Sequence, residues 1–175
     1  MKRFAAITFA LGLAACATPA GPEPDLPVVD LDRYLGRWYE IASLPQYFQR
    51  GCVATTAFYS RLDDGRIRVE NQCRDGTLDG PIRSAEGTAW VAEEGGNAAK
   101  LKVSFFWPFS GHYWIVALDP EYRWALVGHP ERKYLWILSR SPQMDAALYD
   151  SLVDRARGLG YDVDRLVRTP QPDAG

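Results

Sequence analysis

The sequence is poor in the residues that carry out most acid–base, nucleophilic and metal chemistry. Its 175 residues include only two histidines, His112 and His129, and three cysteines. Neither histidine stands in a short motif with a serine or cysteine nucleophile, so no catalytic triad is indicated. No pair of histidines or cysteines has metal-ligand spacing. No glycine-rich loop joins a strand to a helix, as it does in phosphate-binding sites. We expect a protein that is not an enzyme and has no cofactor or metal.

Long apolar runs and an excess of basic charge are absent as well. No apolar run reaches the ~20 residues that a membrane-spanning helix needs. The formal net charge is −2, with both signs scattered along the chain. A nucleic-acid partner is therefore not expected.

The first residues present a short apolar segment after a basic start. Lys2 and Arg3 precede the apolar residues 4–13, and Leu13-Ala14-Ala15-Cys16 follows. This pattern resembles the signal of bacterial lipoproteins. The resemblance implies that residues 1–15 are removed and that Cys16 carries a diacylglycerol and an N-acyl group, which together anchor the chain firmly. The alternative is an ordinary secretory signal that is cleaved after Ala15.

The rest of the chain reads as a tether and one domain. Residues 17–27 are rich in proline, alanine and glycine and cannot bury enough apolar surface to fold. We predict a flexible tether over 16–30, one domain over 31–169 and a tail over 170–175. Ala17 follows the anchor where sorting rules of some bacteria use aspartate for inner-membrane retention, so the outer membrane is expected.

Most of the predicted domain alternates between apolar and polar residues in short runs separated by turn residues. The runs predict an all-β fold, an eight-stranded antiparallel up-and-down β-barrel with room for one small ligand. The predicted strands are 37–44, 53–62, 66–74, 84–92, 99–107, 112–119, 122–129 and 133–140.

One C-terminal helix is predicted to pack outside the barrel. Ser141 is a candidate N-cap, Pro142 suits the first helical position, and Gly158 or Gly160 can end the helix. Residues 161–167 can add a short strand. The apolar stripe of this helix consists of Met144, Leu148, Leu152 and Ala156.

Cys52 and Cys73 flank two alternating runs that meet at the turn signal Asp63-Asp64-Gly65. Hairpin pairing about this turn, with one bulge, makes the two cysteines near cross-strand neighbours. We predict a disulfide that closes a loop of about 22 residues and contributes on the order of 3 kcal/mol. The alternative is that one of these thiols stays free as a nucleophile.

Three motifs in chain order carry a resemblance to the lipocalin family. Gly36 and Trp38 form a glycine-x-tryptophan at the first strand, Asp119 to Tyr122 form an Asp-Pro-Glu-Tyr turn, and Arg140 ends the eighth strand. With the lipoprotein signal, the chain is most similar to the bacterial outer-membrane lipocalins. It departs from the fullest pattern at Leu118, where many members have threonine.

Trp38 and Arg140 are expected at the same closed end of the barrel, because one begins the first strand and the other ends the eighth. A guanidinium over an indole contributes ~1–2 kcal/mol when desolvated. We therefore interpret both as fold residues and not as ligand contacts.

The period of two along a strand, matched to the strand pattern of the family, selects the residues that face the interior. They predict an apolar cavity with a few polar groups, suited to a lipid. The alternative is that they fill a narrow barrel. The predicted ligand-binding residues are Ile67, Val69, Asn71, Leu101, Val103, Phe105, Tyr113, Ile115, Tyr134, Trp136 and Leu138, with Ala117 added on the sixth strand.

The loops at the open end of the barrel are expected at 43–52, 74–83, 107–112 and 130–133. Tyr47, Phe48, Trp107 and Phe109 would ring the entrance. Exposed there, they would contact a membrane or a partner, and the alternative is that the loops fold over their own entrance.

The resemblance implies a protein that binds, stores or transports a hydrophobic small molecule, such as a fatty acid or lysophospholipid, in membrane maintenance. It would be anchored in the outer membrane through Cys16 and face the periplasm, and homodimers are left open. Two alternatives remain. One is an isomerase-like barrel with a free cysteine, and the other is an envelope adaptor with a filled barrel.

Overall fold

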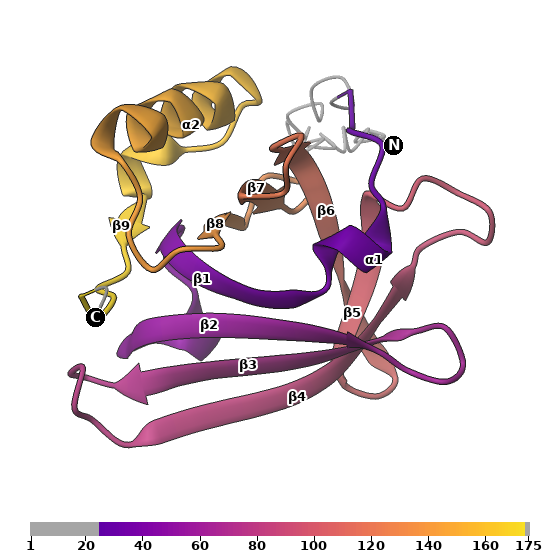
Figure 1. Cartoon of the computed structure of the whole chain (residues 1–175), viewed down its shortest axis with the longest axis horizontal. Coiled ribbons are helices and arrows are strands. Elements are labelled where there is room, and N and C mark those ends of the chain that lie inside the picture. The colour runs from indigo at the N-terminus through magenta and orange to yellow at the C-terminus, as the bar shows by residue number, and fades with distance from the viewer. Residues whose placement is uncertain (1–24, 174–175) are drawn as a thin grey trace, which may run out of the picture.

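The computed structural model describes residues 25–173 (Figure 1). The predicted signal, Cys16 and most of the predicted tether lie outside these residues. No helix within 25–173 is long and apolar enough to cross a membrane. The helical elements are α1 (Leu31–Tyr34), η1 (Tyr47–Gln49), α2 (Ala146–Gly158) and η2 (Val163–Arg165). The strands are β1 (Gly36–Ser43), β2 (Cys52–Arg61), β3 (Ile67–Asp75), β4 (Ile82–Val91), β5 (Lys100–Phe106), β6 (Phe109–Leu118), β7 (Trp124–Gly128), β8 (Leu135–Ser139) and β9 (Val167–Arg168).

The sheet closes on itself. Strands β2 to β8 pair in chain order, and β1 pairs antiparallel with both β8 and β2. The two-residue β9 adds to the far end of β1. The predicted eight-stranded antiparallel barrel with one helix outside it is therefore confirmed, and a closed barrel leaves no long sheet edge exposed.

Alternation along the strands sorts the apolar side chains into two layers. One cluster lies inside the barrel and includes Trp38, Val69 and Ile115. The other lies between the outer wall and α2 and includes Ile137, Leu152 and Ala156. Because both faces of β7 and β8 are covered, these strands are nearly continuous runs of buried residues, as is the end of β6 from Ile115 to Ala117.

A single helical turn closes one end of the barrel, which we name the closed end. The Asp30 side chain caps α1 by accepting hydrogen bonds from the backbone of Asp32 and Arg33. Val29 is buried in the interior cluster and Leu26 packs against it. The described end of the segment predicted as a tether therefore packs against the barrel as part of the fold.

The start of helix α2 differs from the prediction. The helix begins at Ala146, with Asp145 as N-cap accepting from the Leu148 amide at 3.1 Å. Ser141 instead accepts from the Gln143 amide in a local turn. Both Ser141 and Asp145 are good capping residues, so sequence alone did not separate them. The helix ends at Gly158, and Gly160 takes a positive φ of 86°.

The residues after α2 make more contacts with the barrel wall than predicted. Residues 163–165 form a 3-10 helix, so only Val167 and Arg168 are strand. The following residues lie between β1 and β2, where Ala54 donates to the Pro170 carbonyl at 2.7 Å. The Gln171 amide donates to the Thr55 carbonyl at 2.9 Å. Residues 170 and 171, predicted as tail, therefore complete the wall where β1 and β2 separate.

The β2–β3 hairpin has the predicted disulfide. The register shifts between Val53 and Thr56, so that Cys52 pairs with Asp75. The Cα atoms of Cys52 and Cys73 lie 5.4 Å apart, and the two cysteines are bonded. The bulge was predicted, but it leaves Cys73 diagonal to Cys52 instead of opposite it.

Replacing both Cys52 and Cys73 by alanine is expected to lower the free energy of unfolding by about 3 kcal/mol, because the unfolded chain regains loop entropy. Urea denaturation of both proteins, with and without reductant, measures this difference. Reductant should lower the unfolding midpoint of the unmodified chain and leave the double variant unchanged. If reductant does not change the unfolding midpoint of the unmodified chain, even after incubation in the unfolded state, the prediction is contradicted.

Candidate functional site

The closed end is held by the predicted pair of tryptophan and arginine. The Arg140 guanidinium lies 3.9 Å above the ring of Trp38, which is 0% exposed. The indole nitrogen of Trp38 donates to the Tyr34 carbonyl at 2.9 Å. Arg140 also donates to the carbonyls of Arg37 at 2.8 Å and Arg33 at 2.9 Å. The predicted stack is confirmed, and it ties α1 to the first and last barrel strands.

The Asp119 turn supports the same end. The buried Asp119 carboxylate accepts from the Arg123 side chain at 2.8 and 2.9 Å, and these bonds lower the pKa of Asp119. Tyr122 takes a positive φ of 59°, and its hydroxyl accepts from the Asp30 amide at 2.8 Å. Leu118, the departure from the family pattern, packs against the interior cluster. The motif residues therefore hold the closed end together.

The predicted cavity residues divide by height in the barrel. The interior-facing side chains near the closed end are buried. The interior-facing side chains nearer the opposite end keep partial exposure. Ile67, Val69, Leu101, Ile115 and Leu138 form the buried lower level. Asn71, Val103, Phe105, Tyr113 and Trp136 form the partly accessible upper level. The interior is therefore fully buried near the closed end, and its residues nearer the other end are partly exposed.

Two predicted positions differ from this scheme. Ala117 lies in the outer cluster beneath α2, because the β6–β7 register shifts between Ile115 and Ala117 and reverses which face the next residues occupy. Tyr134 precedes β8 and belongs to a loop, where its ring lies 5.9 Å from that of Trp136 and 6.0 Å from that of Phe48.

Three tyrosine hydroxyls meet inside the barrel, and sequence reasoning identified only one of them. The Tyr113 hydroxyl lies 2.9 Å from the hydroxyl of Tyr34 and 2.9 Å from that of Tyr59. Burial raises the pKa of Tyr59 to about 12 and raises the pKa values of Tyr34 and Tyr113 well above the ordinary range. Period two on β2 could have identified Tyr59, but Tyr34 depends on the unpredicted α1.

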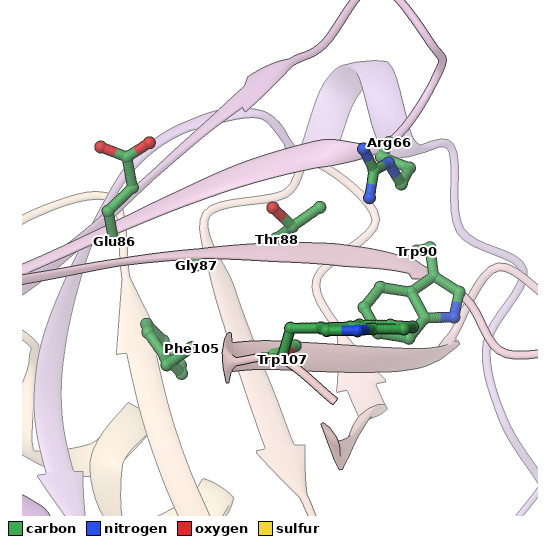
Figure 2. Close-up of a pocket in the computed structure, with 8 residues that line it drawn as sticks. Arg66, Glu86, Gly87, Thr88, Trp90, Phe105 and Trp107 are labelled. Atoms are coloured by element: carbon green, nitrogen blue, oxygen red, sulfur yellow. The ribbon is translucent and has the colours of Figure 1, made fainter. Parts of the chain in front are cut away.

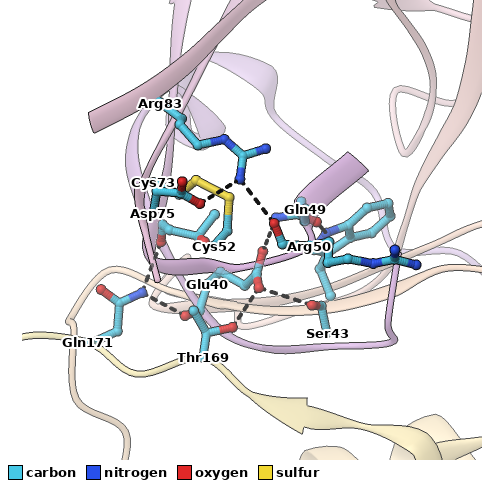
Figure 3. Close-up of a disulfide and its surroundings, with 12 residues drawn as sticks. Glu40, Ser43, Gln49, Arg50, Cys52, Cys73, Asp75, Arg83, Thr169 and Gln171 are labelled. Carbon is cyan, nitrogen blue, oxygen red and sulfur yellow. Dashed lines mark hydrogen bonds and ion pairs between the residues drawn. A yellow bond between two sulfur atoms is a disulfide. The ribbon is translucent and has the colours of Figure 1, made fainter. Parts of the chain in front are cut away.

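A polar network fixes the loop 44–51 to the barrel wall (Figure 3). Trp136 donates from its indole to Gln49 at 3.1 Å, and Gln49 donates to Glu40 at 2.8 Å. Glu40 also accepts from Ser43 at 3.0 Å and from Thr169 at 2.6 Å. Glu40 is 5% exposed, so these hydrogen bonds satisfy a buried carboxylate.

The end opposite α1, which carries loops 44–51, 76–81, 107–108 and 129–134, is named the mouth. The four predicted aromatic residues, three in its loops and Phe109 at the start of β6, are exposed at this end. Tyr47 is 84% exposed, Phe48 58%, Trp107 85% and Phe109 76%. Phe106 and Ile82 are exposed beside them. These side chains are therefore exposed to solvent at the mouth, where a membrane or a partner could contact them.

A separate hollow of about 570 Å³ is lined mainly by residues of the paired strands β4 and β5 (Figure 2). Polar side chains such as Thr88 and Glu86 line it together with Trp90 and Trp107. Phe105 is the one predicted ligand-binding residue among those that line it. A Cβ at Gly87 would stand 2.8 Å from the Phe105 ring, so this glycine lets the two strands approach closely. Sequence reasoning did not identify this hollow.

A family model described as Lipocalin-like domain matches residues 29–171. The chain belongs to this lipocalin-like family. The outer membrane lipoprotein Blc of Citrobacter freundii is 42% identical over 97% of this chain and 96% of its own length. Temperature-induced lipocalin-1 of Arabidopsis thaliana is 44% identical over 83% of this chain and 81% of its own length.

Solved structures share the lipocalin fold. Insecticyanin of the tobacco hornworm Manduca sexta matches with a TM-score of 0.67 at 22% identity, covering 86% of this chain and 85% of that chain. Lobster apocrustacyanin A1 matches with a TM-score of 0.64 at 17% identity, covering 86% of this chain and 91% of that chain. Membership of the lipocalins supports binding of a small hydrophobic ligand, and the Blc relatives support an outer-membrane location.

Proposed function

We propose that this lipocalin is anchored in the outer membrane through Cys16, faces the periplasm, and holds a fatty acid or lysophospholipid in its barrel. The single observation that carries the proposal is the change in exposure along the interior, from buried Ile115 and Leu138 to accessible Tyr113 and Trp136. These upper residues lie toward the mouth, from which a ligand would enter, and this favours a ligand-binding barrel over an envelope adaptor with a filled barrel.

The chemistry of the interior favours a lipid tail. The upper level offers the apolar side chains of Val103, Phe105 and Trp136. Each buried methylene of a ligand contributes ~0.8 kcal/mol in such surroundings. Binding of this kind takes up free lipid next to a membrane, which is how the protein would serve membrane maintenance.

We propose that the bound molecule leaves unchanged. The alternative of an isomerase-like barrel needs a free thiol at Cys52 or Cys73, and these two cysteines are bonded to each other. Residues 25–173 hold no group of three or more His, Cys, Asp or Glu side chains that could bind a metal ion. Both observations favour a binding protein.

Native mass spectrometry of the soluble chain 17–175, titrated separately with a lysophospholipid and a fatty acid, tests the proposal. This form keeps every described element of the fold. The expected result is a saturable 1:1 adduct with at least one of the two lipids. A folded protein that forms no adduct with either would contradict the proposal, and the same spectra show whether homodimers form.

The aromatic residues at the mouth are expected to contact the membrane from which the lipid is taken. Tryptophan and tyrosine favour the interface between bilayer and water. Replacing Phe48, Trp107 and Phe109 by serine in the chain 17–175 should weaken sedimentation with phosphatidylethanolamine–phosphatidylglycerol vesicles by about tenfold or more, because apolar area is no longer buried. Phe58→Ser, on the outer wall, is the matched control. Equal binding by the triple variant and the unmodified chain would exclude this contact.

A further inference from the structure

The three tyrosines inside the barrel span its interior. Tyr34 comes from α1, Tyr59 from β2 and Tyr113 from β6. Strands β3, β4 and β5 separate β2 from β6 on one side, and β7, β8 and β1 separate them on the other. The hydrogen bonds that join these tyrosines therefore cross the barrel, and the three residues are together named the floor.

One of the three hydroxyl protons of this floor is not used in the hydrogen bonds between the tyrosines. Three hydroxyls carry three protons, and the two hydrogen bonds between them use two. The described residues give these hydroxyls no third hydrogen bond. Tyr34 and Tyr59 are buried, whereas Tyr113 keeps partial exposure. In a mostly apolar interior a linked donor of this kind needs an acceptor, and Tyr113 is the only one of the three residues that keeps partial exposure through which a ligand could supply one.

The floor is also uncharged. Burial raises the pKa of each tyrosine, so all three hydroxyls stay protonated at neutral pH. Arg140 acts electrostatically on Tyr34 and Tyr59, but it stacks on Trp38 and donates to backbone carbonyls at the closed end. An ionised carboxylate or phosphate at the floor would lose its water without gaining a counter-charge, which is costly.

We propose that the hydroxyl of Tyr113 forms a subsite for an uncharged oxygen, a hydroxyl or a carbonyl, at the buried end of an elongated apolar ligand. The inference rests on the proposed function, because the ligand must first occupy the barrel. A ligand with one charged end and one uncharged oxygen binds with the charge at the mouth and the oxygen at the floor. A simple fatty acid binds with its carboxylate at the mouth and its tail against the tyrosines.

Two probes of equal chain length, decan-1-ol and decanoate, separate these orientations by calorimetric titration at neutral pH. Tyr113→Phe should weaken decan-1-ol by roughly fivefold to tenfold, because one hydrogen bond is lost, and leave decanoate within about twofold. Tyr149→Phe, on helix α2 outside the barrel, is the matched control and should change neither affinity.

An infrared measurement needs no variant. The carbonyl band of bound ¹³C-labelled methyl decanoate should lie at lower wavenumber than in alkane solvent. In Tyr113→Phe the band should move back to its position in alkane solvent. An unshifted band for the bound ester, together with unchanged decan-1-ol affinity in Tyr113→Phe, would overturn the subsite and leave the proposed function standing. If no probe binds the unmodified chain, the proposed function and the subsite are both contradicted.

Discussion

Replacing Trp38 by alanine is expected to lower the free energy of unfolding by about 3–5 kcal/mol, the range for removal of a buried aromatic side chain. Trp38 is fully buried between the Arg140 guanidinium and the ring of Tyr34, whose centroid lies 4.9 Å from its own. The substitution removes this packing and the hydrogen bond to the Tyr34 carbonyl. Urea denaturation measures the loss.

Trp107→Ala is the matched control, because it deletes the same side chain from an exposed position at the mouth. Its free energy of unfolding should stay within about 0.5 kcal/mol of the unmodified chain. A Trp38→Ala variant that unfolds at the same urea concentration as Trp107→Ala would show that the closed end does not depend on the stack.

Replacing Trp136 by arginine is expected to weaken binding of a lysophospholipid or fatty acid about 100-fold or more, because a charge in the cavity must be desolvated when the tail enters. Trp136 pairs with Val127 and Ser43 and belongs to the accessible upper level. The substitution also breaks the hydrogen bond to Gln49 that helps hold the loop 44–51. The native mass spectrometric titration measures the effect.

Phe58→Arg makes the same kind of change on the outer wall, where Phe58 is exposed. It should bind lipid as the unmodified chain does. A folded Trp136→Arg protein with unchanged affinity would place the ligand outside the barrel, and the hollow lined by Trp90 and Trp107 would then become the alternative site.

The barrel could be predicted from sequence because its causes are local or periodic. Alternation fixed each strand to within a few residues, and the turn at Gly65 brought Cys52 near Cys73. Trp38 and Arg140 could be paired because strand direction alone places the start of the first strand beside the end of the eighth.

The features that sequence reasoning missed depend on irregularities or on distant contacts. A register shift in β6 turned Ala117 outward, and no pattern in the sequence marks it. The floor needs Tyr34 from a one-turn helix that is too short to give a periodic signal. The hollow beside Gly87 depends on how closely β4 approaches β5, which composition does not reveal.

The central claim, that a lipid lies inside the barrel, is tested most directly by magnetization transfer between a bound fatty acid and methyl groups of the isotope-labelled chain 17–175. Val69, Val103 and Ile115 report on the interior, and Ile137 and Val116 report on the wall beneath α2. The predicted result is transfer from the acyl chain to interior methyl groups and none to Ile137 or Val116. Bound fatty acid without transfer to any interior methyl group would contradict the claim.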